Sequence, residues 1–596
     1  MKSARRSNQY SNPQFTFIIC VILFFPHISQ ARQTSSYVFD ATALLKYHNI
    51  DRGDLALFLF SMEGIVNRTG PRLFVSCKEG FWAHGWPKAE EKWIEYCTEK
   101  KGMRFARLIS LDELLDTFKQ DIKGLVIYDE RSDRNSTRLV AVTLAGLENL
   151  LPVSARLANL PSIRAFPVKY DFHHRWENGD YLEPYRWALK ELMPRCNKSI
   201  ACNVPVPFYC NWIDYPVMKK AFCCCLNFHE VFEKEGRIYR REKTDYRMTK
   251  TWEISRENLR VMLDKTPVDL YATRNELGIG RQLFKQLKPP AFIFGLGNPS
   301  ETQYVEEMSA YGHSYICSQF ANLSFFSQIP VANNSFKQNF HPAPSRKLKK
   351  KFYCALITSD GDSPKISQTF FAGHWFDPAR GSVPITWGIN PIFTEWFPVF
   401  FEYYYATATA QDYFMCACNG AGAPHIDRLP NLPQFAQLSA RLCKKADLHI
   451  IDLQTGYPES VAPYAKNAPG IQGFTNCLPY FLDSCVRFIN GNQPWATYSP
   501  LWYWKKNSPE ELKADIENAL YGKKPPFFLL IYPDFPAGNV GADWKNPDLP
   551  RRIPTLWKNT VDMLDTSVYE AVTVDALFDL IKQAALIKTS AQPHIP

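Results

Sequence analysis

The chain has 596 residues, of which 46% are hydrophobic and 21% charged, and its formal net charge is +10. This length is too great for one hydrophobic core and indicates about three to four domains, while the composition excludes an intrinsically disordered chain. The charge is modest for the length, so no nucleic-acid partner is expected. The basic run at residues 346–351 is interpreted as a solvated linker.

The first 31 residues have the features of a secretory signal peptide. Three basic residues precede an apolar run at residues 15–25, and Ser29-Gln30-Ala31 provides a small-x-small cleavage site. About eleven apolar residues are too few to span a bilayer, and no later segment approaches that length. We therefore expect a signal peptide at residues 1–31 and a soluble, secreted mature chain with no membrane partner.

Sequons and cysteines also indicate export. Five N-x-Ser/Thr sequons begin at Asn67, Asn135, Asn197, Asn322 and Asn333. The sixteen cysteines fit an oxidising compartment, and the crowded cysteines between residues 196 and 225 predict a locally stapled loop. We expect a glycoprotein with disulfide bonds, whose connectivity the sequence leaves open.

Residues 32–340 are predicted to form an N-terminal region of α/β subdomains, at about 37–152, 165–243 and 244–332. In the first subdomain strands alternate with helices, which predicts a largely parallel sheet. Its strands are expected at 72–76, 104–109 and 124–128, and its helices at 89–101 and, after a capping box at 110–113, through 118. No G-x-G-x-x-G or Walker pattern follows a strand, so no nucleotide site is inferred.

The second and third subdomains give weaker signals. The second is rich in Cys and Pro, with helices expected at 185–192 and 216–225. The third returns to the α/β pattern, with helices at 276–287 and 303–310 and a strand at 290–294. Prolines and the basic run then mark a linker at 341–351.

Residues 352–596 are predicted to form a (β/α) barrel-like domain. Seven candidate strands occur there, most of them followed by helices, which favours a barrel of seven strands. The strands are expected at 352–358, 383–388, 413–418, 448–452, 470–477, 527–531 and 569–574, and helices at 433–445, 483–489, 509–520 and 575–587.

Acidic residues follow several of these strands. A Ser-Asp-Gly-Asp-Ser turn leaves Asp360 and Asp362 after the first strand, and Glu395, Asp452 and Asp534 follow later ones. In a barrel these strand ends share one face, where two carboxyl groups about 5 to 9 Å apart could cleave a glycosidic bond. Aromatic residues in or near the same loops could stack on sugar rings; they are Trp375, Trp387, Trp396 and Tyr403.

Other chemistries fit the sequence less well. A metal-dependent carbohydrate esterase would need His ligands at helical spacing, but only His374 lies near the acidic turn and no H-x(3,4)-H follows. A G-x-S-x-G nucleophile elbow is absent from the sequence. We therefore expect carboxylate catalysis with no metal and no cofactor.

Several ordered segments resemble the GxGYP family of secreted proteins, which are proposed to be glycoside hydrolases. They are 359–363 (SDGDS), 384–391 (PITWGINP), 395–398 (EWFP) and 419–424 (NGAGAP), with 63–68 (EGIVNR) and 71–74 (PRLF) near the N-terminus. The resemblance covers nearly the whole mature chain and implies an N-terminal α/β region, a barrel-like domain with the active site, and a carbohydrate substrate. The catalytic candidates are Asp360, Asp362 and Glu395, with Asp452 added from its strand-end position; the substrate-binding candidates are Trp387, Asn390, Asn419, Gly420 and Gly422.

The chain departs from the motif that names the family, because Ala423 stands where Tyr is expected. The leading hypothesis is a secreted glycoside hydrolase with Asp360 or Asp362 as nucleophile or electrostatic stabiliser and Glu395 as general acid/base. The alternative is a non-catalytic glycan-binding or cell-surface interaction protein on the same scaffold. A third hypothesis, a metal-dependent deacetylase-like enzyme, predicts that chelators abolish activity. The sugar, the linkage, the stereochemical outcome and the oligomeric state are left open.

Overall fold

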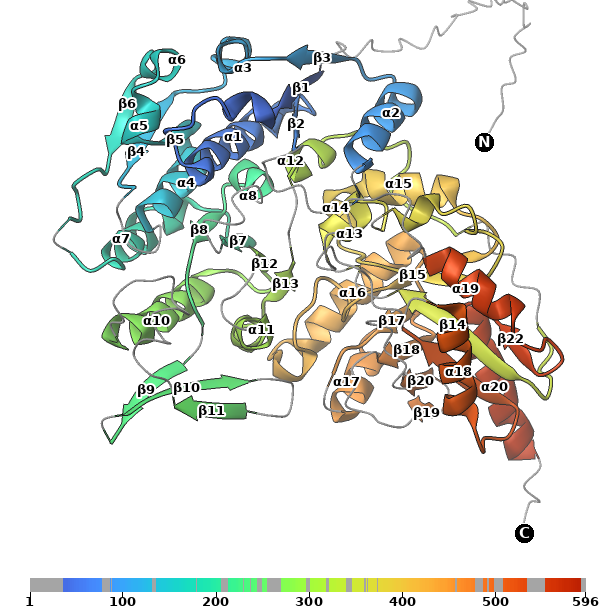
Figure 1. Cartoon of the computed structure of the whole chain (residues 1–596). Helices are drawn as coiled ribbons and strands as arrows, with labels where there is room; N and C mark the ends of the chain where they lie inside the picture. Colours follow the sequence, from blue (N-terminus) through green and yellow to red (C-terminus); the bar gives the residue numbers. More distant parts are fainter. Residues whose placement is uncertain are drawn as a thin grey trace, which may run out of the picture. The chain divides into compact units, whose positions relative to one another are not determined.

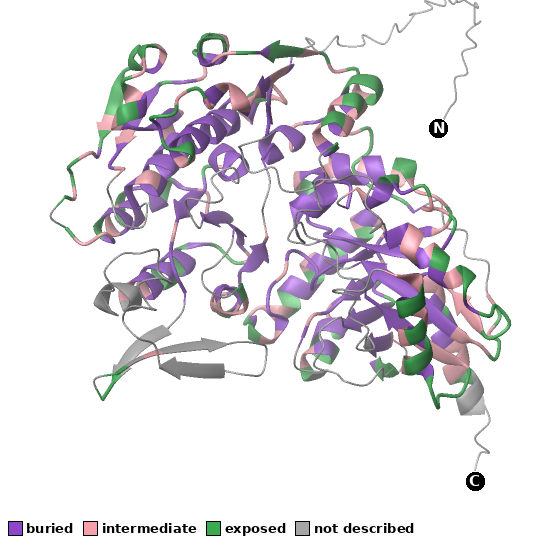
Figure 2. Cartoon of the chain, viewed as in Figure 1, coloured by how far each residue is buried: buried purple, intermediate pink, exposed green. Residues whose placement is uncertain are grey.

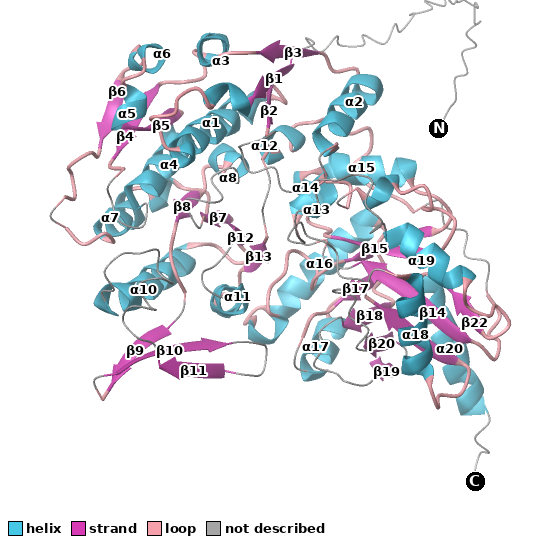
Figure 3. Ribbon diagram, viewed as in Figure 1, coloured by secondary structure: helices cyan, strands magenta, loops and turns pink. Residues whose placement is uncertain are grey.

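The computed structural model describes residues 36–77, 86, 88–130, 136–177, 179–204, 213–228, 230–235, 237–243, 249–253, 270–295, 301–317, 321–338, 346–358, 361, 363–371, 373–455, 458–476, 486–489, 493–497, 508–532 and 553–590. Ser35–Pro596 form one compact unit. The predicted signal peptide and three predicted site residues, Asp360, Asp362 and Asp534, lie outside the described residues. Helices and strands alternate along most of the chain (Figure 1, Figure 3).

The N-terminal region is built around helix α1 (Arg52–Val66), which is buried along nearly its whole length (Figure 2). The helix begins after Asp51, whose side chain accepts hydrogen bonds from the N–H groups of Gly53 and Asp54. Its residues from Asp54 onward are all buried, so it packs on every side, as expected for a helix with no polar face.

Three parallel sheets and one antiparallel sheet make up this region. The first, in the order β2-β1-β3, contains β1 (Ser36–Asp40), β2 (Leu73–Ser76) and β3 (Phe105–Leu108). The second, β5-β4-β6, contains β4 (Gly124–Tyr128), β5 (Leu150–Ser154) and β6 (Val168–Asp171). The third, β13-β12-β7-β8, contains β7 (Ile200–Asn203), β8 (Phe222–Cys224), β12 (Phe292–Gly295) and β13 (Ser314–Ile316). The antiparallel sheet is β9 (Glu230–Lys234), β10 (Arg237–Lys243) and β11 (Thr249–Glu253).

Helices connect these strands. They are α2 (Ala89–Lys101), α3 (Leu111–Phe118), α4 (Ser136–Glu148), α5 (Ala155–Ala158), α6 (Pro161–Arg164), α7 (Glu183–Glu191), α8 (Asp214–Met218), α10 (Leu270–Gln286), α11 (Glu301–Ala310) and α12 (Leu323–Phe326). The third sheet joins strands from both sides of the expected boundary at residues 243 and 244.

A nine-stranded sheet forms the C-terminal region, in the order β19-β20-β18-β17-β16-β15-β14-β21, with β22 also paired to β14. Its strands are β14 (Phe352–Thr358), β15 (Ile385–Ile389), β16 (Asp412–Cys416), β17 (Ile450–Asp452), β18 (Gly473–Asn476), β19 (Val486–Ile489), β20 (Gln493–Thr497), β21 (Phe527–Ile531) and β22 (Tyr569–Ala571). Every pair is parallel except β19 with β20. The sheet curls into a half-barrel, and among the described strands its ends, β19 and β21, are not paired with each other, so closure into a seven-stranded barrel is not confirmed.

Eight helices accompany this sheet in the described chain. They are α13 (Pro364–Gln368), α14 (Phe393–Trp396), α15 (Pro398–Thr407), α16 (Leu432–Ala446), α17 (Val461–Lys466), α18 (Pro509–Leu520), α19 (Ile553–Asp562) and α20 (Val574–Ser590). The basic segment that was predicted to be a solvated linker contacts the last strand of the sheet, because both Arg346 and Lys351 pair with Glu570 of β22.

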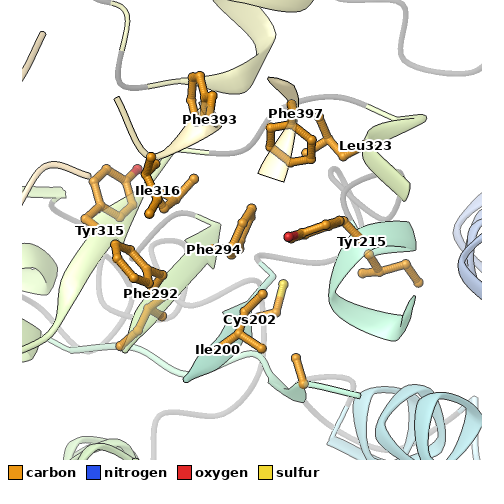
Figure 4. Close-up of a cluster of buried hydrophobic side chains, with 14 of the residues drawn as sticks. Ile200, Cys202, Tyr215, Phe292, Phe294, Tyr315, Ile316, Leu323, Phe393 and Phe397 are labelled. Atoms are coloured by element: carbon orange, nitrogen blue, oxygen red, sulfur yellow. The ribbon is translucent and has the colours of Figure 1, made fainter. Parts of the chain in front are cut away.

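Aromatic side chains join the four-stranded sheet to the start of the C-terminal region. Figure 4 shows Phe292 and Phe294 of β12 and Tyr215 of α8 facing Phe393, the first residue of α14, and Phe397, which follows that helix. The rings of Tyr215 and Phe397 lie 5.0 Å apart. Burial of several aromatic rings at one place is a large stabilising contribution.

Most predicted elements are present with bounds shifted by a few residues, but two predictions are wrong. The helix expected at 483–489 contains strand β19, and the helix expected at 216–225 contains only the end of α8 before β8 begins. In β19, Val486 pairs with Ala496 of β20, a strand that the sequence pattern did not reveal. The β-branched and aromatic residues Val486, Phe488 and Ile489 suit such a pairing better than a helix.

Cysteines that were expected to staple a loop with disulfide bonds lie instead in the core of the four-stranded sheet. No disulfide joins two of the described cysteines. Cys202, Cys223 and Cys224 lie buried in β7 and β8 as strand residues. Burial raises the pKa of the Cys196 thiol to about 12, as expected for a thiol in apolar surroundings.

In two of the five sequons the asparagine is buried in the fold. Asn67 is fully buried; its amide donates to the Leu73 carbonyl and its side-chain oxygen accepts from the Leu73 N–H. Asn322 is 1% exposed, and both ends of its side chain bond to the backbone of Val75. Neither amide can carry a glycan in this fold, whereas Asn333 is exposed.

Candidate functional site

The candidate site lies at the carboxyl ends of β15, β16 and β17. These strands are parallel neighbours, so the segments that leave them meet at one edge of the sheet. That edge brings together Asn390, the loop at 418–424, and Asp452. Four of the predicted residues, Asn390, Asn419, Gly422 and Asp452, are linked there through backbone and side-chain hydrogen bonds.

Asn390 connects three segments. Its N–H donates to the carbonyl of Gly361, 3.1 Å away, and its side-chain oxygen accepts from the N–H groups of Ile392 and Gly422, each at 3.1 Å. Gly361 stands between the two predicted carboxylates of the acidic turn. The side chain is fully buried, and its amide nitrogen has no hydrogen-bond partner within the described chain. A buried donor without a partner costs about 1 to 3 kcal/mol and is therefore a candidate for contact with a ligand.

The loop at 418–424 is held in an unusual backbone conformation. Cys418, Asn419 and Gly420 have φ values of +50°, +70° and +112°, a region that non-glycine residues rarely occupy. Asn419 secures it from both sides, because its side chain donates to the Pro424 carbonyl at 2.7 Å and accepts from the Gln454 N–H at 2.6 Å. Such over-determined strain is typical of functional loops.

The two glycines of this loop permit close packing. A Cβ on Gly420 would lie 2.2 Å from Ser439 Oγ, and one on Gly422 would lie 2.3 Å from Ser314 Oγ. The N–H of the next residue, Ala423, donates to the Tyr315 carbonyl of β13. Both glycines were predicted to bind substrate. In this structure Gly420 packs against Ser439 of α16, and Gly422 packs against β13 of the four-stranded sheet.

Asp452 is the last residue of β17 and is fully buried. Its Oδ1 accepts a hydrogen bond from Thr475 Oγ1 at 2.7 Å, and its carbonyl accepts from the Asn419 N–H at 2.8 Å. The strand-end position predicted for this carboxylate is the one observed.

Glu395 lies away from this cluster. Its neighbours Phe393 and Phe397 pack toward the four-stranded sheet, which leaves the Glu395 side chain exposed. Its Oε1 pairs with Lys445 at 2.9 Å, near the end of α16. Ser439, which binds the loop through the Ala421 N–H, stands six residues earlier on that helix, a rise of about 9 Å.

Trp387 is a core residue in this structure. It lies within β15, is fully buried, and donates its indole N–H to Asp412 Oδ1 at 2.8 Å. Its ring packs against those of Phe371 and Trp375, with centroids 4.9 and 5.3 Å away. No face of the ring is open to a sugar.

Sequence reasoning missed another carboxylate at the strand ends, Asp427. It lies in the short 3-10 turn Ile426–Arg428 that follows the 418–424 loop, and it is only partly buried. Its Oδ1 accepts from Thr455 Oγ1 at 2.5 Å. The sequence signal that could have identified Asp427 was its place in the loop after a predicted strand. The same kind of argument identified Asp452.

The N-terminal EGIVNR segment has a structural role. Glu63 of α1 is fully buried, and burial, followed by the charge of Asp214, raises the pKa of its carboxyl well above the ordinary value. Burial raises the pKa of Asp214 to about 7. Arg68 closes the segment by donating to the carbonyls of Met218 and Val217 on α8.

Two family models match the chain. Residues 350–481 match "GxGYxYP putative glycoside hydrolase C-terminal domain", and residues 122–196 match "GxGYxYP_N second domain". The resemblance inferred from the sequence segments is confirmed by these matches. The comparison with curated proteins found no match.

The structure is similar to that of a putative hydrolase from Bacteroides thetaiotaomicron. The two are 17% identical, with a TM-score of 0.69 over 92% of this chain and 95% of the other, which shows a shared fold. Partial similarities, each with a TM-score of 0.28, extend to a 4-alpha-glucanotransferase from Thermococcus litoralis, 11% identical over 38% of this chain and 40% of the other, and to a putative polysaccharide deacetylase from Mycobacterium smegmatis, 10% identical over 40% of this chain and 92% of the other.

Within the described residues, no helix is both long and apolar enough to cross a membrane. Over the same residues, no group of three or more His, Cys, Asp or Glu side chains is arranged to hold a metal ion.

Proposed function

We propose that this chain, which carries two domains of the GxGYxYP family, is a secreted glycoside hydrolase whose carboxylates act at the carboxyl ends of parallel strands. The observation that carries the proposal is the cluster at this edge of the sheet. It joins the buried amide of Asn390 to Gly361 of the acidic turn, to the 418–424 loop and, through that loop, to Asp452.

Glycosidic cleavage needs one carboxyl group that protonates the leaving oxygen and a second that attacks or stabilises the anomeric carbon. We assign the second role to Asp360 or Asp362, which flank Gly361. The amide nitrogen of Asn390, buried beside that glycine, is suited to donate a hydrogen bond to a substrate hydroxyl.

The test is release of sugar by the purified, full-length mature chain. We expect reducing sugar from at least one glycan in a broad polysaccharide panel, and we expect Asp360→Asn or Asp362→Asn to lower kcat by at least about 100-fold without loss of folding. An active wild type whose two variants both keep full activity would contradict the assignment. Loss of wild-type activity on chelation would favour metal-dependent deacetylation.

A non-catalytic glycan-binding protein is the second candidate, favoured by Ala423 in place of the family tyrosine. In this structure the backbone N–H of Ala423 donates to the Tyr315 carbonyl of β13, so the loop is held in place without the tyrosine hydroxyl. Glycan binding by calorimetry, together with no sugar release from any bound glycan, would support this candidate. Sugar release that responds to the carboxylate variants would exclude it.

Export is part of the same proposal. It is based on the predicted signal peptide at residues 1–31. Expression in a secreting eukaryotic cell should give a protein in the medium whose N-terminus lies near residue 32. Retention of Met1 on an intracellular protein would contradict it.

A further inference from the structure

The basic run at residues 346–351 is held against the C-terminal sheet. Its backbone is fixed by Gln583 of α20, whose Oε1 accepts from the Leu348 N–H at 3.0 Å and whose Nε2 donates to the Arg346 carbonyl at 2.8 Å. At the other end of the run, the Lys351 side chain donates to a backbone carbonyl between α19 and β22. The run therefore belongs to the folded surface, where its charges have defined positions.

A second group of lysines precedes the neighbouring strand. Strands β14 and β21 are parallel, with Phe352 opposite Phe527, and the Phe527 N–H donates to the Lys351 carbonyl at 3.2 Å. Lys523 and Lys524 stand just before β21, and the Lys523 Nζ lies 5.7 Å from the centroid of the Phe527 ring. The residues that lead into β14 and β21 therefore lie side by side, although they are far apart in the sequence.

Five lysines of this surface are exposed and form no ion pair with another described residue. They make up what we call the lysine patch: Lys347, Lys349, Lys350, Lys523 and Lys524. Acidic side chains beside the patch have other partners. Glu570 pairs with Arg346 and Lys351, and Asp565 accepts hydrogen bonds from the N–H and hydroxyl groups of Ser567. Unpaired charges of one sign raise the local positive potential and attract a polyanion.

The lysine patch lies at the opposite end of β14 from the candidate site. The seven residues of β14 span about 20 Å, and the acidic turn at 359–363 follows the far end of the strand. The patch is therefore a surface separate from the strand-end edge at which we place hydrolysis.

We propose that the lysine patch binds an acidic polysaccharide, one that carries sulfate or carboxylate groups along its length. Runs of five to eight basic residues are typical of polyanion-binding surfaces. Lysine ammonium groups are point charges on flexible stems, which suit single anionic groups repeated along a flexible polymer. An exported chain meets extracellular glycans rather than nucleic acid or the anionic lipids of the cytoplasmic leaflet. The choice of ligand thus depends on the proposed export but not on the proposed hydrolysis.

The test uses heparin as the probe and the full-length mature chain. Calorimetry measures the affinity, and the salt concentration that elutes the protein from a heparin column gives a second readout. The wild type should bind at about 0.15 M salt, and the logarithm of its affinity should fall linearly with the logarithm of salt concentration, because each lysine contact releases counterions. A neutral dextran of the same length should not bind.

Two pairs of substitutions test whether the lysines form one surface. Lys349→Gln with Lys350→Gln, and Lys523→Gln with Lys524→Gln, should each weaken heparin binding about 3-fold, and all four together at least about 10-fold. The matched control removes the same charge from four exposed lysines of the N-terminal region that form no ion pair with a described residue. These are Lys100, Lys123, Lys285 and Lys288, and their change to Gln should alter the affinity less than about 2-fold.

Equal losses in the patch and control variants would show attraction by net charge alone and overturn the proposal. Loss from only one of the two lysine pairs would do the same, because the pairs would not share a ligand. Tighter patch-dependent binding to duplex DNA or to phosphatidylserine vesicles than to heparin would overturn the choice of ligand. The patch variants should leave sugar release from a short, soluble glycan unchanged. Heparin binding without any hydrolysis would uphold this inference and contradict only the proposed hydrolase function.

Discussion

The side-chain oxygen of Asn390 accepts a hydrogen bond from the backbone N–H of Gly422, 3.1 Å away. This contact joins the end of β15 to the loop after β16, and the same oxygen also accepts from the Ile392 N–H. A single amide therefore fixes the geometry between two neighbouring strand ends.

Asn390→Ala should destabilise the fold by about 2 to 4 kcal/mol, because it leaves two buried N–H groups without an acceptor. Urea unfolding checks this value. Asn467→Ala is the control, since the Asn467 amide makes an exposed bond to the Pro463 carbonyl; it should cost less than about 1 kcal/mol. Equal effects of the two variants would show that the buried bonds contribute little.

Gly422→Ala should be more destabilising than Gly470→Ala. Both glycines have positive φ, +77° and +86°, so both variants carry a backbone cost of about 1 to 2 kcal/mol. A Cβ on Gly422 would also meet Ser314 Oγ at 2.3 Å, whereas one on Gly470 would meet nothing within 4 Å. We expect a further loss of about 1 to 3 kcal/mol for Gly422→Ala, measured by thermal or urea unfolding.

Asp214→Asn should remove much of the dependence of the free energy of unfolding on pH. Burial raises the Asp214 pKa to about 7 in the folded state, above its ordinary unfolded value of about 3.9, so the folded state binds more protons between these values. The wild type should therefore lose stability as the pH rises from about 4 to about 7. The variant should be about 2 to 4 kcal/mol more stable than the wild type at pH 8 and equal to it near pH 3.

Urea midpoints across this pH range measure the effect. Glu63, whose pKa is also raised by burial, should leave a residual slope of the same sign in the Asp214→Asn variant. An unchanged slope would show that Asp214 is not the titrating group.

The sequons should differ in glycan occupancy. Protein secreted from eukaryotic cells should carry no glycan at Asn67 or Asn322, because both amides are buried and hydrogen-bonded. Peptide mass spectrometry checks this. Asn67→Gln should destabilise by about 2 to 4 kcal/mol, since its longer side chain breaks three bonds to the backbone of Arg72 and Leu73. Asn333→Gln, at an exposed sequon, should change stability by less than about 0.5 kcal/mol.

Local patterns were sufficient for most elements of the fold. The capping serines Ser110 and Ser508 both accept from the backbone N–H three residues later, and their helices end at the predicted residues, 118 and 520. Strand β14 has the predicted bounds because a continuous apolar run is typical of a strand buried on both faces. Strand β20 was missed, and so β19 was taken for a helix, because that strand depends on partners distant in the sequence.

The candidate site likewise contains residues whose place followed from the sequence and residues whose place did not. The position of Asp452 at a strand end followed from the hydrophobic run before it, whereas Asn390 was a candidate only through the family resemblance. The place of the Trp387 side chain did not follow from the sequence, because a tryptophan in a strand can face either solvent or core, and here Asp412 and the neighbouring rings bury it.

The sequence by itself determined the alternation of strands and helices and the resemblance to the GxGYxYP family, since both depend on residues close together in the chain. Only the tertiary structure decided which carboxylates share the strand-end edge. Phe393 and Phe397 pack against the four-stranded sheet and leave Glu395 in solvent, while Thr455 from the next strand orients Asp427. Burial of aromatic surface far outweighs the placement of one charged side chain, so the packing between the two regions leaves Glu395 in solvent.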